Sequence, residues 1–591
     1  MGVPGFFAWL MRQRGGKRIL KDNIASGPVK QFYIDSNCLF HPQCFNLLKH
    51  MPAEKNVGKL EKKMIQRILN YMDYIIEYVD PTDLVYISVD GVAPLAKINQ
   101  QRKRRFRAVD DLRIRNTIKR KHNVEINDIW SNTAITPGTE FMELLHAAID
   151  MHIQERQKKE RDNNKTQRKY IYSSYHTAGE GEHKILQHMK TDKSNDNIVV
   201  YGLDADLFFL SMASQKQNIY LLRESREIDR NVPESNVIDP VTDVVEPLTY
   251  ASIDETIECA TNILKHTITQ KMRAQKLDND MKLDDDMIRN DFVFMCYLLG
   301  NDFLPHFPSI DVKKKGLDII IDVYSDIIID NRAYLFNNDG AINQDILMNL
   351  ISNLAKLEYE YFTITLPKET KRFSKFKCEE QDPYLRDLWR LEHMKLFKVV
   401  DDIRLGEGNE EEWKQRYYDH YFGHYVTETN TLNDVIDQLC KEYIEGLVWV
   451  TKYYFDECPD YKWQYTHTHA PFLSDLARYA DKMRESFNIN DIKFVKRPVF
   501  EPMQQLLAVL HPKSRSLLPT SYRYLVHAAD SPILDMFPEK LQLDMINKDL
   551  FWQCIPMIES VEPDRIIEAT KGLKLSKDEK KRNRVDPDLI Y

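Results

Sequence analysis

Short apolar stretches alternate with longer amphipathic segments through the first part of the chain. The apolar stretches are typical of buried parallel strands and cover residues 31–35, 84–90, 169–174 and 198–201. Between them, apolar residues recur at helical spacing over residues 59–79, 95–122 and 140–157. This alternation predicts an α/β fold, a mostly parallel β-sheet with helices on both faces. Its active site is expected at the carboxyl edge of the strands.

The pattern changes further along the chain. Residues 223–250 show no clear period and are predicted to form a loop or an irregular insertion, and residues 291–302 are predicted to form an apolar helix. Beyond about residue 340 the spacing is mainly helical, with many Tyr, Phe and Trp residues. We therefore predict an α/β core at residues 1–340 and a largely α-helical region at residues 341–591.

Composition narrows the class of protein. No run of about 18 apolar residues is present, so a membrane span is not expected, and the N-terminus lacks the basic segment of a secretory signal. Eight scattered cysteines without a Cys-x-x-Cys pair suit a reducing compartment. The net charge is −8, so any contact with nucleic acid must come from local basic patches.

Carboxylates follow the predicted strands in a recurring pattern. Glu180 and Glu182 are spaced i, i+2, as are Asp204 and Asp206, and the second pair follows a buried strand. Any one of these acids alone could be a helix cap or a surface residue. Their recurrence at strand ends instead predicts a site for Mg²⁺, or Mn²⁺ in its place, with room for two ions. The full acidic set, expected to be both metal-binding and catalytic, is Asp35, Asp90, Glu180, Glu182, Asp204, Asp206 and Asp302.

A basic helix is predicted directly after Asp90. Lys97, Gln101, Arg104 and Arg105 fall at i, i+4, i+7 and i+8, which places them on one face. Such a run is often only a solvated surface. Because this helix starts close to the expected metal site, we predict that its face binds a phosphate group.

Aromatic residues provide a third candidate feature. His41 lies six residues after Asp35, and a segment far along the chain contains Tyr461 and Trp463. Aromatic clusters are more often part of a core, but such rings also stack on nucleic-acid bases.

Several of these segments together resemble the XRN family of 5′→3′ exoribonucleases, over essentially the whole chain. The matching segments are Met1–Pro4 with Phe6 and Phe7, Asp35–Asn37 with His41, Asp90–Pro94 with Lys97–Arg105, Gly179–Lys184, Tyr201–Leu207, Gly300–His306, Trp413–Tyr418, His469–Pro471, Pro498–Pro519 and Lys581–Asn583.

The resemblance implies a nuclease core similar to the PIN and flap nucleases. It implies that the seven acids coordinate Mg²⁺ and that Lys97, Gln101, Arg104 and Arg105 hold the 5′-monophosphate of single-stranded RNA. His41 and one ring of the Tyr461–Trp463 segment would stack on the 5′ base. The family usually has Trp at both positions of that segment, and we expect Trp463 to be the stacking residue, with Tyr461 as second choice. Ser36 replaces the usual Met of the Asp-Met-Asn motif and leaves the acid in place.

The expected activity is processive 5′→3′ hydrolysis of 5′-monophosphorylated single-stranded RNA to mononucleotides, in RNA decay. The enzyme is expected to be a cytoplasmic monomer, with nuclear residence left open, and the added C-terminal domains of long family members are not expected. Two alternatives remain at this point. A flap-endonuclease-like enzyme would share the acidic chemistry but needs a helix-hairpin-helix motif, which we do not find. A non-enzymatic RNA-binding protein would typically have lost one or more of the acids.

Overall fold

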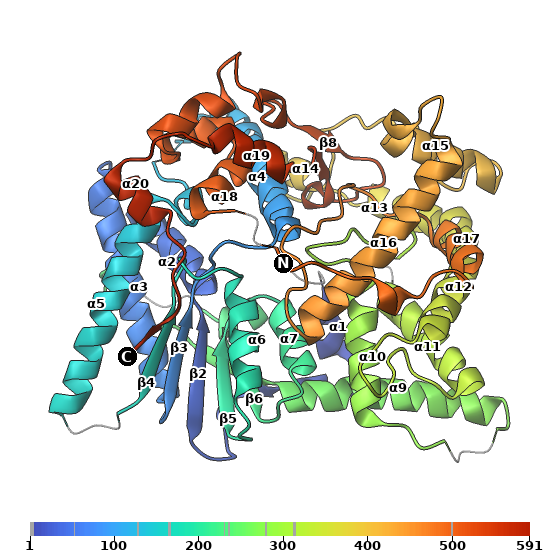
Figure 1. Cartoon of the computed structure of the whole chain (residues 1–591), viewed down its shortest axis with the longest axis horizontal. Coiled ribbons are helices and arrows are strands. Elements are labelled where there is room, and N and C mark those ends of the chain that lie inside the picture. The colour runs from blue at the N-terminus through green and yellow to red at the C-terminus, as the bar shows by residue number, and fades with distance from the viewer. Residues whose placement is uncertain are drawn as a thin grey trace.

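The computed structural model describes residues 5–51, 54–126, 129–163, 167–229, 231–233, 237–277, 281–310, 315–497 and 500–591. Met1–Pro4 and Pro498, which belong to segments that carry the family resemblance, lie outside these ranges. The described chain is built around one eight-stranded sheet with the strand order β1-β7-β6-β5-β2-β3-β4-β10. Figure 1 shows the sheet on one side of the molecule and a helical mass on the other.

The central strands of the sheet are parallel, as the alternating pattern predicts. Parallel pairing joins β6 to β5, β5 to β2, β2 to β3 and β3 to β4, whereas β1, β7 and β10 pair antiparallel. The parallel strands are β2 (Val29–Asp35), β3 (Leu84–Ser88), β4 (Lys169–Ser173), β5 (Asn197–Tyr201) and β6 (Ile219–Glu224). The antiparallel strands are β1 (Leu20–Lys21), β7 (Leu248–Ser252) and β10 (Leu589–Ile590), of which β1 and β10 form the two edges.

Two separate cores cover the two faces of this sheet. Because side chains alternate along a strand, Phe32 and Ile34 of β2 enter one core while Tyr33 enters the other. The first core is closed by α2 (Ser36–His50), α3 (Val57–Val79) and α5 (Glu140–Asp162). The second is closed by α1 (Phe6–Arg12), α6 (Gly181–Thr191), α7 (Asp206–Ala213) and α9 (Ile253–Ala274). The predicted α/β fold class, with a mostly parallel sheet and helices on both faces, is confirmed.

The prediction of an irregular insertion over residues 223–250 is wrong at both ends. Strand β6 continues to Glu224, a short helix α8 follows at Ser225–Ile228, and β7 begins at Leu248. Strand β7 pairs antiparallel with β6. A strand of only five residues gives too short an alternation to stand out from its polar surroundings.

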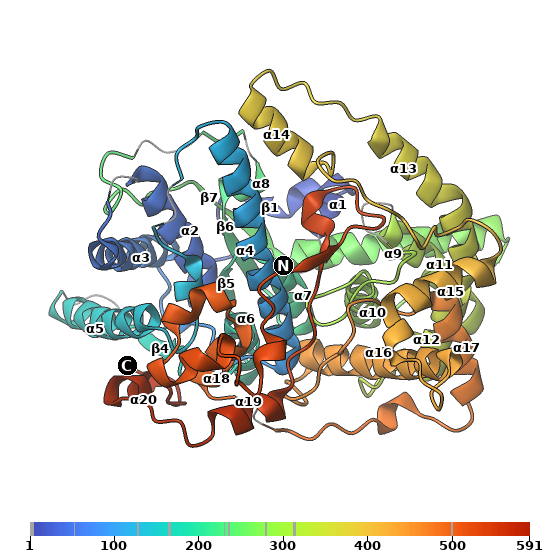
Figure 2. The same cartoon turned by 90° about the horizontal axis from the view of Figure 1, so that it is seen from above.

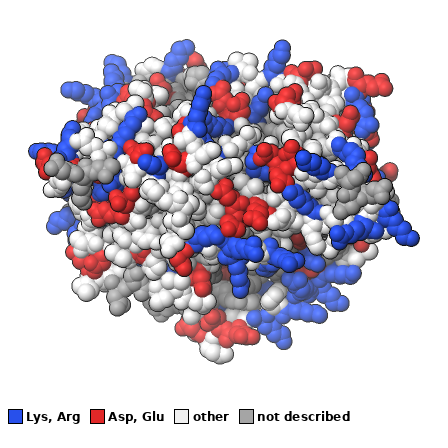
Figure 3. Space-filling view, turned by 90° about the horizontal axis from the view of Figure 1, so that it is seen from below, with Lys and Arg blue, Asp and Glu red and all other residues white. Residues whose placement is uncertain are grey.

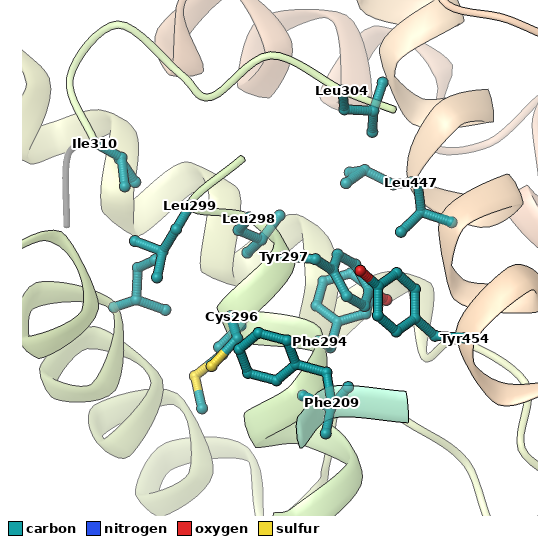
Figure 4. Packing of buried hydrophobic residues seen from close by; sticks show 14 of the residues in the cluster. Phe209, Phe294, Cys296, Tyr297, Leu298, Leu299, Leu304, Ile310, Leu447 and Tyr454 are labelled. Carbon is teal, nitrogen blue, oxygen red and sulfur yellow. The ribbon is translucent and has the colours of Figure 1, made fainter. Parts of the chain in front are cut away.

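Most of the helical region, up to residue 489, continues the second core, whereas most buried apolar residues of 500–566 form a third apolar cluster with residues 92–106. Its helices are α10 (Asp285–Tyr297), α11 (Gly316–Asn331), α12 (Gln344–Glu360), α13 (Leu366–Ser374), α14 (Pro383–Glu392), α15 (Glu410–Phe422), α16 (Leu432–Phe455), α17 (Leu473–Met483), α18 (Pro502–Val509), α19 (Pro563–Thr570) and α20 (Lys577–Arg582). Figure 4 shows Phe209 of α7 beside Phe294 and Tyr297 of α10, with Tyr454 of α16 against them. One apolar cluster therefore joins the sheet to the helices, and the domain boundary near residue 340 stays a prediction.

Helix α4 (Leu95–Lys121) connects the site to the outer helices. Its 27 residues contain neither Gly nor an internal Pro, so nothing in the sequence breaks it. Seen from above, it runs outward from the centre of the molecule toward α14 (Figure 2). Its N-terminal half is buried against α18, where Arg102 Nη1 donates to the Ala508 carbonyl at 2.8 Å. Burying cations destabilises the folded chain unless they have partners. The polar residues on the buried part of α4 are therefore candidates for a functional role.

Within the described residues, no helix is both long enough and apolar enough to cross a membrane.

Candidate active site

The predicted acids are placed at the carboxyl ends of neighbouring strands. Asp35 is the last residue of β2, Asp90 follows β3, Glu180 follows β4 at the start of α6, and Asp204 follows β5. Glu182 lies in the first turn of α6, and Asp206 is the first residue of α7. Because parallel strands bring their carboxyl ends to one edge of the sheet, acids distant in sequence meet there.

Asp35 and Asp90 both lie against Gly181. A methyl group built on Gly181 would lie 2.9 Å from Asp35 Oδ1 and 3.3 Å from Asp90 Oδ1, so only glycine fits. The Gly181 amide donates to Asp90 Oδ1 at 2.7 Å. Asn37 donates from Nδ2 to Asp90 Oδ2 at 2.9 Å and accepts from the Asp90 amide at 3.2 Å. Asn37 therefore fixes the orientation of this carboxylate. It was predicted only as part of a motif, without a role of its own.

The Lys97 ammonium lies among three of the acids. It forms an ion pair with Glu180, lies 2.9 Å from Asp302 Oδ2 and 3.9 Å from Glu182 Oε1. Burial acts to lower the pKa of Lys97, but Asp302, Glu180 and Glu182 outweigh it and raise the pKa. The structure thus brings Lys97 to the acidic cluster itself, and its predicted role toward a phosphate stays a prediction.

Two tyrosines from α16 contact the acidic cluster, and neither was predicted as a site residue from the sequence. Tyr453 donates to Glu180 Oε1 at 2.6 Å and Tyr454 donates to Asp206 Oδ1 at 3.2 Å. Both are buried and lie in an apolar helix, where an aromatic residue is normally read as core. They bind the helical region directly to the acids.

Mutual repulsion and burial raise the pKa of several acids. Burial and the neighbouring Asp90 raise the pKa of Asp35 to about 8. Burial and Asp302 raise the pKa of Asp206 to about 6. Burial also raises the pKa of Glu182, opposed by Lys97 and reinforced by Asp206. Carboxyls that resist ionisation in this way are stabilised by a nearby cation.

A divalent metal ion is such a cation, and the chemistry of the donors fits Mg²⁺. All predicted donors are carboxylate oxygens, and Glu182 Oε2 is buried yet accepts no hydrogen bond from any residue that the structure describes. In the conformation seen, no three acidic, His or Cys side chains of the described residues are grouped closely enough to hold an ion. The Lys97 ammonium supplies the positive charge there, so metal binding requires these side chains to rearrange around it.

These pKa shifts predict how stability depends on pH in protein treated with chelator. The pKa values of Asp35 and Asp206 are higher in the folded chain than in the unfolded chain. Their contribution to stability is therefore complete below pH ~4 and is lost as pH rises through about 6 and about 8. We expect a lower melting temperature at pH 8.5 than at pH 6, and Mg²⁺ should restore it at pH 8.5. A melting temperature in chelator with the same pH dependence in the wild type and in Asp35→Asn would contradict this.

The other predicted phosphate-binding residues lie on α4 near His41. Burial, together with Arg104 and Arg105, lowers the pKa of His41 to about 4, which places these cations close to the ring. Arg105 Nη1 donates to Thr136 Oγ1 at 2.6 Å, and Arg104 has no hydrogen bond or ion pair with another described residue. Gln101 is buried, and its Oε1 accepts no hydrogen bond from the described part of the chain. Turning this amide would present an N–H group at the same point.

The two candidate stacking residues are in different surroundings. Trp463 stacks on Trp449 with ring centroids 5.0 Å apart, and its edge closely approaches Gly446. The hydroxyl oxygen of Tyr461 lies 3.5 Å from where a side chain on Gly179 would begin, beside Glu180. The structure therefore places Tyr461 next to the acids and gives Trp463 a packing partner, and the stacking role of Trp463 stays a prediction.

The sequence is also similar to known proteins. Residues 1–225 match the family model described as the XRN 5′-3′ exonuclease N-terminus, and residues 282–393 and 390–591 match the Xrn1 helical domain. This chain belongs to the XRN family.

Similar XRN proteins differ from this chain in length. It is 26% identical to 5′-3′ exoribonuclease 1 of Saccharomyces cerevisiae, with 100% of this chain and 44% of that protein covered. It is 26% identical to 5′-3′ exoribonuclease 2 of Debaryomyces hansenii (100% and 72% covered) and 27% identical to human 5′-3′ exoribonuclease 1 (99% and 35% covered). The chain thus spans less than half of both exoribonuclease 1 proteins.

Basic side chains gather locally on the surface of this XRN chain. Figure 3 shows Lys and Arg side chains grouped over one part of the face seen from below, with acidic side chains in smaller groups. The net charge is −8, so this group of cations is a local feature of a chain that is acidic as a whole.

Proposed function

We propose that this chain is a 5′→3′ exoribonuclease that hydrolyses single-stranded RNA carrying a 5′-monophosphate and releases mononucleotides. The observation that carries the proposal is the position of α4. Its first turns bring Lys97 into the acidic cluster, and the next turns place Arg104 and Arg105 beside His41. A cutting site and a phosphate-binding face therefore lie one or two helical turns apart.

The residues divide the reaction between them. Lys97, Gln101, Arg104 and Arg105 bind the terminal phosphate, and His41 stacks on the first base. The seven acids Asp35, Asp90, Glu180, Glu182, Asp204, Asp206 and Asp302 would hold two Mg²⁺ ions, for which Mn²⁺ can substitute. When bound, this metal supplies an activated water and stabilises charge on the leaving oxygen.

Direction follows from this division. The phosphate-binding residues fix the 5′ end, so the bond that meets the acids is the next one along the strand. Lys97 and Arg105 sit on a buried helix that cannot shift easily, which leaves little room for a cap or a triphosphate.

A time course on RNA tests the reaction. With RNA carrying a labelled 5′-phosphate we expect early release of labelled mononucleotide in Mg²⁺ and none in chelator. Early appearance of longer labelled fragments would indicate an endonuclease, and intact RNA in Mg²⁺ would indicate a binding protein. Either outcome contradicts the proposal.

Arg104→Ala combined with Arg105→Ala should reduce the preference for a 5′-phosphate over a 5′-hydroxyl by at least ~100-fold. Each lost charge-assisted hydrogen bond to phosphate costs about 1.5–3 kcal/mol. The measurement is the ratio of initial rates on the two RNAs. Arg113→Ala with Arg120→Ala, on the exposed outer part of the same helix, is the matched control and should leave the ratio unchanged. If Mg²⁺ affinity fell instead of the ratio, the phosphate role would be wrong.

A further inference from the structure

A second hollow lies beside the acidic cluster. It is a cavity of about 570 Å³ between α4 and the helical region, and Asp302 is part of its wall. Helix α4 contributes residues spaced by three or four positions, which form one of its faces: Ala96, Asn99, Gln100, Lys103, Arg104 and Arg107. We call this cavity the α4 chamber.

The chamber is distinct from the proposed 5′-phosphate site. Lys97, Gln101 and Arg105 do not line it, and Arg105 is turned toward Thr136. Only Arg104 borders both spaces, because it lies between the two faces of the helix. The α4 chamber and the proposed 5′-phosphate site therefore lie on different faces of one helix.

The wall of the chamber is positively charged. Lys103, Arg104, Arg107 and Lys548 line it, whereas its one carboxylate, Asp302, already faces Lys97. Arg107 is held in place, since its Nε donates to Asp111 Oδ1 at 2.7 Å. No hydrogen bond or ion pair joins Lys103 to another residue of the described chain, and burial lowers the pKa of Lys103 to about 8. An ammonium partly removed from water without a counter-charge favours an anionic ligand.

Another part of the wall is aromatic. Tyr417, Tyr421 and Tyr465 line it, and Tyr421 stacks on His469 with centroids 3.6 Å apart. Trp552 lies at the edge of the chamber with 51% of its surface exposed. Tyr417, His469 and Ala470 of this wall come from segments 413–418 and 469–471, which carry the family resemblance and have no role in the proposed reaction. A cavity lined by both cations and aromatic rings suits a nucleotide. The cations contact its phosphate, and the aromatic rings contact its base.

We propose that the α4 chamber is a second nucleotide-binding site, in which Lys103 contacts a phosphate and the aromatic wall contacts a base. The inference rests on the proposed exoribonuclease function. Its ligand is either the nucleoside 5′-monophosphate that has been released or the next nucleotide of the RNA strand. The chemistry is the same in both cases, and a binding experiment distinguishes them.

Binding is measured in chelator, so that RNA stays intact and the result does not depend on hydrolysis. Equilibrium dialysis with labelled adenosine 5′-monophosphate counts the bound nucleotides, and fluorescence anisotropy gives the affinity for a 5′-phosphorylated RNA of eight adenosines. Lys103→Glu is compared with the wild type and with Arg120→Glu, an equal change of charge on the exposed end of α4. Lys103→Gln, which removes the charge and keeps most of the side chain, serves if Lys103→Glu does not fold.

For a released product, we expect the wild type to bind two nucleotides and Lys103→Glu to lose one of them, with affinity reduced at least ~10-fold. Arg105→Ala should lose the other. For the RNA strand, mononucleotide binding is the same in the wild type, Lys103→Glu and Arg120→Glu, and Lys103→Glu binds the RNA at least ~10-fold more weakly than Arg120→Glu does. If Lys103→Glu and Lys103→Gln match Arg120→Glu in both measurements, the chamber is not a nucleotide site. Failure of the exoribonuclease proposal would appear separately, as intact RNA in Mg²⁺.

Discussion

Asp206→Asn should reduce the rate of RNA hydrolysis by more than ~100-fold while leaving the fold intact. Changes to groups that merely orient a metal ligand typically cost 10- to 100-fold, and Asp206 is expected to be a ligand itself. The fold should survive because the asparagine side-chain oxygen can still accept the Tyr454 hydroxyl, which lies 3.2 Å from Asp206 Oδ1. Removing one buried acid should also relieve repulsion from Asp302.

Initial rates on 5′-phosphorylated RNA and a thermal melt together test this expectation. Asp481→Asn, an equal change at an exposed position of α17, is the control and should retain the wild-type rate. A folded Asp206→Asn protein with more than a tenth of the wild-type rate would show that Asp206 does not take part in catalysis.

Gly91→Ala should damage both stability and activity. The added methyl group would lie 1.9 Å from the Thr177 carbonyl oxygen, which belongs to the backbone and cannot turn aside. Gly91 also joins two loops, since its amide donates to the Gly179 carbonyl at 2.9 Å and the Gly179 amide donates to Val92 at 2.8 Å. Overpacking of this kind costs about 1–3 kcal/mol of unfolding free energy. Separating the loops should also move Asp90 away from Glu180 and slow hydrolysis.

The measurements are the melting temperature and the hydrolysis rate of the protein that remains folded. Gly423→Ala is the matched control, because a methyl group there would meet no atom within 4 Å. Equal melting temperatures for the two variants would mean that the Gly91 loop adjusts freely and does not fix the spacing of the acids.

The parts of this site that could be predicted from the sequence are those with a local pattern. An apolar run ending in Asp35 or Asp204 places an acid at a strand end, and parallel pairing then brings the strand ends together. Spacing along one helix likewise related Arg104 to Arg105 and Gln101. In each case the signal lies within a few residues.

The contacts that escaped prediction join residues far apart in sequence. Tyr453 is 273 residues from Glu180, and nothing around it differs from an ordinary apolar helix. The position of Lys97 among the acids likewise depends on where Asp302 is placed, 205 residues later by its numbering. Helical spacing predicted the phosphate-binding face of α4. The face that lines the α4 chamber could not be predicted, because the rest of the lining comes from segments far along the chain.

The bonds from Tyr453 and Tyr454 to the acids have a consequence for biosynthesis. A ribosome that has reached residue 302 has produced all seven proposed metal ligands, but neither tyrosine. Glu180 and Asp206 gain these partners only after about 150 further residues have been synthesised. A growing chain therefore carries all of its proposed ligands well before two of them are held in place.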